Sequence, residues 1–168
     1  KERDLMEMID IHMKAATSDI DAVEGRGALN FLTLDDMVIS KEGELVDPES
    51  VLVLPFSGRL PRFPEFTSGS EDPLLQRIQR SGKKWVVITD DKDEAHYALD
   101  ADSFLREVFF SGKALNPLHF CHKPIVITDP DTPFEEAILR LKVVPQRTGD
   151  DVIDEDLILL WGTVKKII

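Results

Sequence analysis

Side chains that could do chemistry lie closest together in the segment HFCHK, which contains His119, Cys121 and His122. In an extended chain His119 and Cys121 share one face, so the pair could contact a soft metal ion. A closed zinc site needs four ligands, and no second cysteine or paired histidine follows at ligand spacing. A thiol nucleophile would need an orienting group and an oxyanion hole, and the sequence offers neither. We interpret HFCHK as a loop that enters a strand, and we predict neither a metal site nor a catalytic residue.

A second group of candidate ligands is the acidic run DDVIDED, residues 150–156. Carboxylates bind Mg²⁺ together with water molecules, so a magnesium site is one interpretation. The run lacks the glycine and the ligand spacing of an EF-hand loop, and acidic runs usually form solvated surface. We predict a strand that leads into a solvated turn.

Four further side chains could contact a nucleotide. Trp85 and Trp161 lie in apolar strand contexts and could stack on a base, with core packing as the alternative. Lys123, next to Pro124 at the start of a predicted strand, could contact phosphate, and so could Arg147. An exposed cation without a ligand is the alternative for both.

Composition limits the class of protein. The chain has 168 residues, 42% of them hydrophobic and 31% charged, which is typical of a soluble globular protein with a real core. The net charge is −12, and such an acidic surface repels nucleic acid. The longest apolar runs, such as VLVLPF, are much shorter than the roughly 20 residues that span a bilayer. The single cysteine excludes an internal disulfide framework and is typical of a reducing compartment.

The chain begins KERDL, without Met, and stops within the pattern VKKII. We therefore expect it to be a piece of a longer protein.

Apolar periodicity and turn residues predict an alternation of strands and helices after an irregular N-terminal part. The predicted helices are 1–16, 69–82, 100–112 and 132–141, and the predicted strands are 33–40, 51–56, 65–68, 84–89, 95–99, 124–129, 151–156 and a hairpin within 157–168. The sequence around Ser70 predicts the start of one helix, and Gly82 predicts its end. Thr132 and Glu135 have the spacing of a capping box around Pro133.

The predicted order of elements occurs twice. Pro73 and Ile78 match Pro133 and Ile138 at an offset of 60 residues, and VITD at 87–90 matches DVID at 151–154 at an offset of 64. Units of about 60 residues bury their sheets better as a pair than alone. We predict an α/β (α+β) fold of two βαββα units in a pseudo-twofold arrangement.

Two segments resemble the CBS domain family, in which paired domains form a Bateman module. PIVITDPDTPFEEAILRL (124–141) resembles the first strand and helix of a CBS domain, and WVVITDDKDEAHYALDADSFL (85–105) resembles its central hairpin and second helix. The resemblance covers residues 61–168. The segments RDLMEMIDIHMKAA and TLDDMVIS, which precede it, resemble the connector of CorC/HlyC-type (hemolysin-like) magnesium and cobalt efflux proteins.

The resemblance implies three parts: an N-terminal connector at 1–57, a first CBS domain at 58–115 and a second, C-terminally truncated one at 116–168. It implies a regulatory module at the cytoplasmic face of a membrane, attached to a transporter domain, that binds ATP or AMP, with Mg²⁺, in the cleft between the sheets. The apolar helix faces FLREVFF and FEEAILRL also predict a homodimer. No enzymatic activity is expected.

The expected ribose-binding residues depart from the family pattern. Where the family has Thr or Ser at the start of the second helix and Asp three residues later, this chain has Asp100 and Ser103. A carboxylate facing phosphate would weaken nucleotide binding by ~1 kcal/mol. Asp102 is one residue out of register and could take the ribose role, but all three residue types are also typical helix N-caps. In the second unit the equivalent segment would begin after Ile168.

Two functional hypotheses therefore stay open. The first is a regulatory module that senses an adenine nucleotide through Asp100, Asp102, Ser103, Lys123, Pro124 and Arg147. The second is a structural dimerisation module whose ligand site is degenerate and binds no nucleotide.

Overall fold

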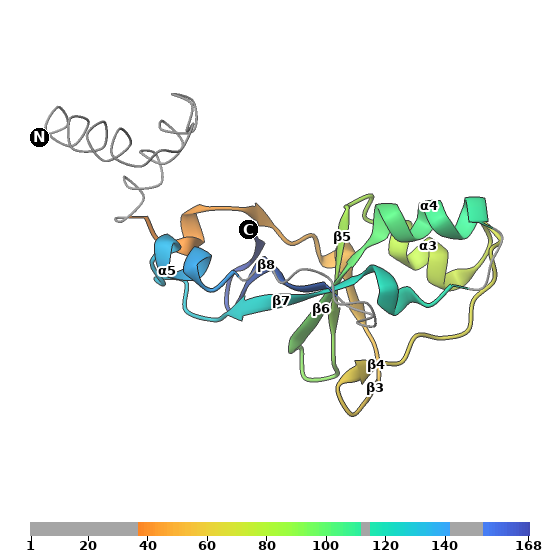
Figure 1. The fold of residues 1–168 in the computed structure, drawn as a ribbon, viewed down its shortest axis with the longest axis horizontal. Coiled ribbons are helices and arrows are strands. Elements are labelled where there is room, and N and C mark those ends of the chain that lie inside the picture. The colour runs from red at the N-terminus through yellow and green to blue at the C-terminus, as the bar shows by residue number, and fades with distance from the viewer. Residues whose placement is uncertain (1–36, 112–114, 142–152) are drawn as a thin grey trace, which may run out of the picture. The chain divides into compact units, whose positions relative to one another are not determined.

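Seven strands form one mixed sheet in the order β1-β9-β8-β7-β6-β5-β2 (Figure 1). The structure is a computed structural model that describes residues 37–111, 115–141 and 153–168. The strands of the sheet are β1 (Glu44–Leu45), β2 (Val51–Val53), β5 (Trp85–Thr89), β6 (Ala95–Asp100), β7 (Cys121–Ile127), β8 (Ile153–Trp161) and β9 (Lys165–Ile167). A separate hairpin is formed by β3 (Phe56–Ser57) and β4 (Leu60–Pro61). The mixed α/β class predicted from the sequence is confirmed.

The first half of the sheet contains β2, α3 (Pro73–Gln79), β5, β6 and α4 (Ala101–Ser111) in chain order. β2 and β5 are parallel, with Val51 opposite Val87. β5 and β6 form an antiparallel hairpin, with Trp85 opposite Asp100. The predicted domain boundaries assign residues 51–53 to the connector, but here they supply the first strand of this half.

The second half repeats that order with β7, α5 (Phe134–Leu139), β8 and β9. β7 and β8 are parallel, and β8 and β9 are antiparallel. The two halves join where β6 pairs with β7, with Leu99 opposite Cys121. Strand β1 extends the sheet beyond β9, with Glu44 opposite Ile167. The two halves therefore share both the order of their elements and the directions of their strands.

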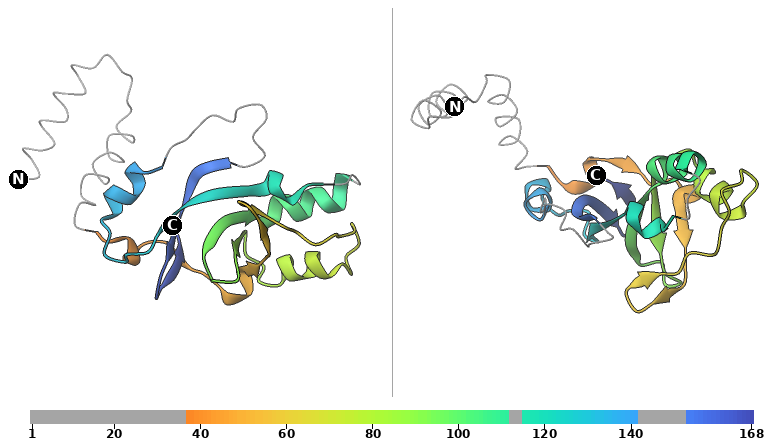
Figure 2. Two further views of the ribbon diagram at one scale, coloured as in Figure 1. Left: turned by 90° about the horizontal axis from the view of Figure 1, so that it is seen from below. Right: turned by 45° about the vertical axis from the view of Figure 1, so that its right-hand side comes forward.

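The sheet curls (Figures 1 and 2), and side chains from both halves meet on its inner face. The buried residues that meet there, called the inner core below, are Val87, Ala95, Ala98, Leu157, Leu159 and Trp161. Between the two halves, Trp161 Nε1 donates to the Asp93 carbonyl at 2.7 Å. The strand positions predicted for Trp85 and Trp161 are confirmed, and the rings contact the inner core.

The other face of each half is covered by its own helices. In the first half α3 and α4 bury Leu75, Ile78 and Phe104 against the sheet. In the second half α5 and the 3-10 helix Ile39–Lys41 cover Ile127, Ile158 and Leu160. Figures 1 and 2 show α3 and α4 together at one end of the sheet and α5 towards the other.

The helix starts differ in detail from the sequence prediction. Helix α3 begins at Pro73, and its N-cap is Asp72 rather than Ser70. It ends before Gly82, whose φ of +63° is the left-handed conformation that glycine favours.

The predicted capping box is wrong. The N-cap of α5 is Pro133, which has no side-chain cap hydrogen bond, and the Thr132 hydroxyl donates to the Asp129 carbonyl at 2.9 Å. A tight turn that starts at Asp129 therefore holds the hydroxyl away from the helix.

Two further predictions, a strand at 65–68 and a turn within 151–156, are also wrong. Residues 65–68 form no strand, because Phe66 packs its ring against Phe104 at 5.6 Å instead of joining the sheet. The turn expected within 151–156 is absent from its described part, since strand β8 extends from Ile153 to Trp161 and pairs with β7, with a register shift between Lys123 and Ile125.

The predicted helix at 1–16 and the first part of the strand at 33–40 lie outside the described residues. At Val38 the chain forms an isolated antiparallel bridge with Pro133, and the 3-10 helix follows. No helix among the described residues is long and apolar enough to cross a membrane.

Candidate functional site

A cavity of about 350 Å³ lies where the β3–β4 hairpin, the β5–β6 hairpin and β7 meet. It is lined by Phe56, Gly58, Arg59, Asp90, His96, Tyr97 and Lys123. Lys123 belongs to the second half and the other lining residues precede it in the first half or in the β3–β4 hairpin. The cavity therefore combines residues that lie far apart in the sequence.

The β3–β4 hairpin places Arg59 at the cavity. Gly58 has a φ of +63°, which suits a two-residue hairpin turn, and Arg59 follows it at the tip. The Tyr97 hydroxyl donates to the Arg59 carbonyl at 3.0 Å and holds this turn against β6. The Phe56 ring lies 4.6 Å from the His96 ring, centroid to centroid, so aromatic surface forms one wall.

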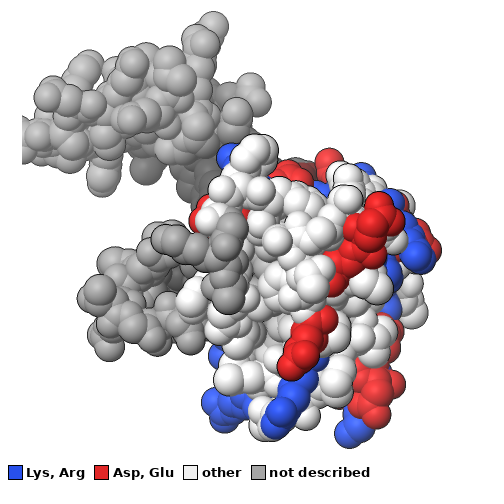
Figure 3. Space-filling model, turned by 90° about the vertical axis from the view of Figure 1, so that its right-hand side faces the viewer, with Lys and Arg blue, Asp and Glu red and all other residues white. Residues whose placement is uncertain are grey.

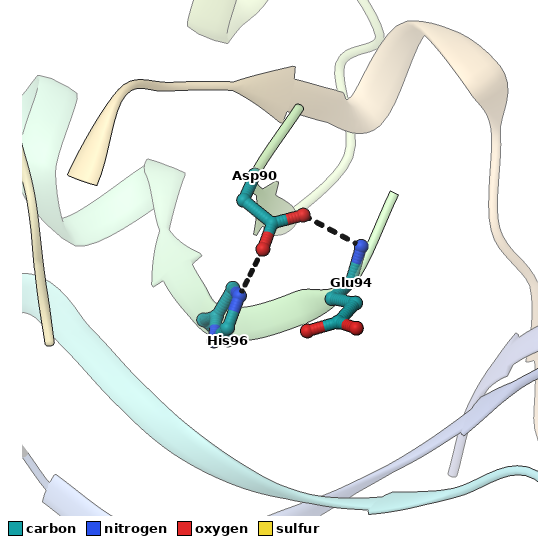
Figure 4. Close-up of side chains that lie close together, drawn as sticks. All are labelled: Asp90, Glu94 and His96. Atoms are coloured by element: carbon teal, nitrogen blue, oxygen red, sulfur yellow. Dashed lines mark hydrogen bonds and ion pairs between the residues drawn. The ribbon is translucent and has the colours of Figure 1, made fainter. Parts of the chain in front are cut away.

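Asp90 and His96 are joined across the β5–β6 hairpin (Figure 4). His96 Nε2 lies 2.9 Å from Asp90 Oδ2, and Asp90 Oδ1 accepts the backbone N–H groups of Lys92 and Glu94 at 2.9 and 3.0 Å. The His96 hydrogen bond, followed by the backbone N–H of Glu94, holds the pKa of Asp90 below its usual value. Asp90 therefore stays ionised at neutral pH.

Lys123 is an exposed residue of β7, and its neighbour Pro124 is buried in the same strand. Among the described residues neither Lys123 nor Arg59 forms an ion pair with a carboxylate. The cavity thus presents two cations, one carboxylate and aromatic surface. Cations bind phosphate, a carboxylate accepts from hydroxyl groups, and rings stack on a planar base.

The predicted ribose residues lie elsewhere, at the junction of β6 and α4. Asp100 Oδ1 accepts the backbone N–H of Ser103 at 3.0 Å, which is the N-cap interaction given as the alternative. Asp100 also lies 4.0 Å from Lys84 Nζ, and Asp102 and Ser103 are exposed. None of the three lines the cavity that contains Lys123. Arg147 lies outside the described residues.

A second cavity of about 290 Å³ lies near this junction and is lined in part by Lys83, Lys84 and Trp85. Its cations already have partners: Lys83 lies 3.9 Å from Glu44, and Lys84 lies 4.0 Å from Asp100. Lys84 Nζ also lies 4.8 Å from the centre of the Trp85 ring and covers one ring face. A phosphate and a base would have to displace these contacts.

A larger cavity, about 670 Å³, lies between residues 61–68, α4 and the 3-10 helix Pro117–Phe120. Its described lining is mostly apolar or proline, with Glu65 as the charged member. A phosphate would find no cation there among the described lining residues. This cavity is therefore the poorer candidate for an anionic ligand despite its size.

The HFCHK side chains do not converge on one site. Cys121 is fully buried against the helices of the first half, burial raises its pKa to about 12, and its Sγ donates to the Pro117 carbonyl. Its thiol is therefore neutral and shielded from solvent. The neighbouring His122 contacts the ring of Trp85, which packs against the inner core. His122 Nδ1 lies 2.8 Å from Asp156. Asp156, from the acidic run, is thus a partner of a histidine on an adjacent strand.

The sequence predicts the turn at 90–94 and the strand at 95–99, but not that the side chains of Asp90 and His96 meet across them. The available signal was the polar residues on both sides of a short hairpin turn, since such positions face each other across the strands.

Comparisons of the chain with protein-family models, curated proteins and solved structures found no match. The functional argument therefore depends on the fold and on the chemistry of the cavity.

Proposed function

We propose that the chain is a paired regulatory module of the CBS type, which binds an adenine nucleotide in the cavity lined by Arg59, Asp90 and Lys123. The repeated order of strands and helices supports this proposal, because two βαββ halves share one sheet and one inner core. In the proposal the two halves are related by a pseudo-twofold axis.

The observation that carries the proposal is the set of side chains around the cavity. Arg59 and Lys123 would contact the phosphates, and Phe56 with His96 would offer aromatic surface to the base. Asp90 would accept from the ribose hydroxyls, in place of the residues first predicted for that role. A volume of about 350 Å³ lies at the lower end of the roughly 300–1,000 Å³ typical of small-molecule sites.

In the proposal, a ligand that binds in this cavity changes how the two halves are arranged. Arg59 and Lys123 come from parts of the chain that precede and follow the junction of the halves. A phosphate between them stabilises arrangements in which both cations approach it, and it changes the population of arrangements that differ in affinity. In the longer protein, we propose, the connector conveys this change to a membrane domain that exports divalent cations.

Titration calorimetry with ATP, AMP and adenosine, each with and without Mg²⁺, tests the proposal. We expect ATP and AMP to bind more tightly than adenosine, because only they carry phosphate. Lys123→Ala should weaken ATP binding by about tenfold or more, the value of one charge-assisted hydrogen bond. Lys92→Ala, which removes an exposed lysine outside the cavity, is the matched control. Absence of heat for all three ligands would contradict the proposal.

The alternative function is a structural dimerisation module, and exposed apolar side chains favour it. Phe110 on α4 is 86% exposed and Leu139 on α5 is 71% exposed. Figure 3 shows the end of the unit that carries α3 and α4, where broad uncharged areas separate the charged side chains. Sedimentation of the wild type and of Phe110→Asp tests this alternative. A dimer that Phe110→Asp dissociates, with no heat from any nucleotide, would favour it over nucleotide sensing.

A further inference from the structure

Three potential metal ligands meet on the β5–β6 hairpin. Asp90, Glu94 and His96 each offer one ligand atom, and these atoms all lie within 4.8 Å of one another (Figure 4). The set contains an imidazole nitrogen as well as two carboxylates. Because of the imidazole, the set discriminates between metal ions better than an acidic surface cluster would.

The hairpin holds these ligands in place before any ion binds. Two backbone N–H groups occupy Asp90 Oδ1, which leaves Oδ2 directed towards His96. The turn between the ligands contains Asp93 with a φ of +62°, and the Asp93 carbonyl accepts from Trp161 Nε1 at 2.7 Å. This contact ties the turn to the other half of the sheet, so ion binding costs little further ordering.

One pair of the ligand atoms, from Asp90 and His96, has the spacing of neighbouring ligands in a coordination sphere, and all three atoms lie within 4.8 Å of one another. Metal–ligand bonds of about 2.1 Å place neighbouring ligand atoms about 3.0 Å apart in an octahedron and about 3.4 Å apart in a tetrahedron. The observed separation of Asp90 Oδ2 and His96 Nε2 is 2.9 Å. Glu94 is exposed, so its carboxylate can rotate to complete the set. The adjoining cavity leaves the remaining positions to water.

We propose that Asp90, Glu94 and His96 bind a divalent transition-metal ion such as Zn²⁺ or Co²⁺ when no nucleotide is present, since Asp90 and His96 also line the proposed nucleotide cavity. Imidazole favours these ions over Mg²⁺ and Ca²⁺, which prefer oxygen ligands alone. On binding, His96 Nε2 donates its lone pair to the ion in place of the hydrogen bond to Asp90, and the neutral ring carries its proton on Nδ1. The two carboxylates balance the charge of the ion.

Titration of the 168-residue chain with Co²⁺, in the absence of nucleotide, tests this site. We expect visible absorption bands that saturate at one equivalent and that Zn²⁺ removes by competition. Glu94→Gln and His96→Gln should each weaken Co²⁺ binding by about tenfold or more. Asp90→Asn should do the same while keeping an acceptor for the turn.

Two controls separate the site from non-specific binding and from loss of the fold. Asp91→Asn removes an exposed carboxylate of the same turn that is outside the ligand set, and it should leave the titration unchanged. Far-UV circular dichroism should show that every variant keeps the fold of the wild type. No Co²⁺ bands at millimolar metal, or bands of equal affinity in Glu94→Gln and His96→Gln, would overturn the proposal.

The Co²⁺ titration and the ATP titration can fail separately, so the metal site and the proposed function are tested independently. ATP binding to chelator-treated protein that shows no Co²⁺ bands would overturn the metal site and leave the proposed function standing. Saturable Co²⁺ bands without any heat from ATP or AMP would support the metal site alone.

Discussion

At the scale of single residues, short acidic side chains hold the starts of the helices of the first half. Asp72 accepts the backbone N–H groups of Thr67 at 2.8 Å and of Leu74 at 2.9 Å. Asp100 accepts that of Ser103 at the start of α4. Each carboxylate satisfies amide groups that the first turn of a helix leaves without partners.

The first prediction concerns Asp72 and pH. The Thr67 N–H, followed by those of Leu75 and Leu74, outweighs burial and lowers the pKa of Asp72. A lowered pKa in the folded state stabilises the fold above the unfolded pKa, and this contribution is lost as pH falls through the folded value. Asp72→Asn keeps the shape but removes the charge. In urea unfolding, the wild type should therefore exceed Asp72→Asn in stability at pH 7, and the difference should shrink below about pH 4. A difference that does not change with pH would contradict this assignment.

The second prediction concerns Thr89, which is fully buried at the end of β5. Its hydroxyl has no hydrogen-bond partner within the described residues. An unpaired buried hydroxyl costs about 1–3 kcal/mol. Thr89→Val keeps the shape and removes the hydroxyl, so it should raise the free energy of unfolding by about 1 kcal/mol. Thr128→Val, at an exposed position, is the control. Destabilisation by Thr89→Val in chemical denaturation would show that the hydroxyl has a partner.

At the scale of elements, the Phe104 ring is the largest fully buried side chain of α4 and lies at the centre of an aromatic cluster. Phe104 is fully buried, and the rings of Phe66 and Phe120 each meet it at 5.6 Å, edge to face. The three rings join a helix, an irregular segment and the 3-10 helix before β7. The position of α4 therefore depends on residues that come before and after it in the chain.

The third prediction follows from this packing. Phe104→Ala should lower the free energy of unfolding by about 3–5 kcal/mol, because it leaves a large cavity at the centre of the cluster. Phe110→Ala on the same helix should change it little, since that ring is 86% exposed. Urea denaturation of both variants measures the difference, and equal effects would show that α4 packs differently.

The elements that the sequence predicts well are those with strong local signals. The strand at 84–89 and the helix at 100–112 match β5 and α4 closely, because β5 is a continuous apolar run typical of a buried strand and the apolar residues of α4 recur at helical spacing. The sequence predicts strands at both 51–56 and 65–68, and it assigns the first of them to the connector rather than to the first half. Only the pairing of Val51 with Val87 decides between them, and this pairing is a long-range contact that local patterns do not contain.

In the candidate site too, local sequence patterns identify some residues, and long-range contacts decide the others. Lys123 was selected from the sequence because it lies beside Pro124 at the start of a strand, and it lines the cavity. The contribution of Arg59 depends on how the β3–β4 hairpin docks on Tyr97, which no local pattern predicts. Asp100 fits both a ribose ligand and an N-cap by residue type, and only its hydrogen bond to the Ser103 N–H distinguishes the two.

At the scale of the whole molecule, the inner core links the two halves. Leu157 and Leu159 from β8 meet Val87 and Ala98 from the first hairpin. Neither half buries this face by itself, so we expect each half to be less stable alone than in the pair. The net charge of −12 does not appear as one acidic patch on the face in Figure 3, where acidic and basic side chains are interspersed. Arg59 and Lys123 line one cavity, so we propose that their local charge, rather than the net charge of the chain, governs the binding of an anionic ligand there.

The central claim is that a nucleotide binds in the cavity between the two halves rather than at the start of α4. Amide chemical-shift mapping of the ¹⁵N-labelled chain during titration with ATP tests this claim most directly. We predict the largest shifts at Arg59, His96 and Lys123, with smaller changes at Ala101–Phe104. Shifts confined to Ala101–Phe104, or no shifts at millimolar ATP, would contradict the account.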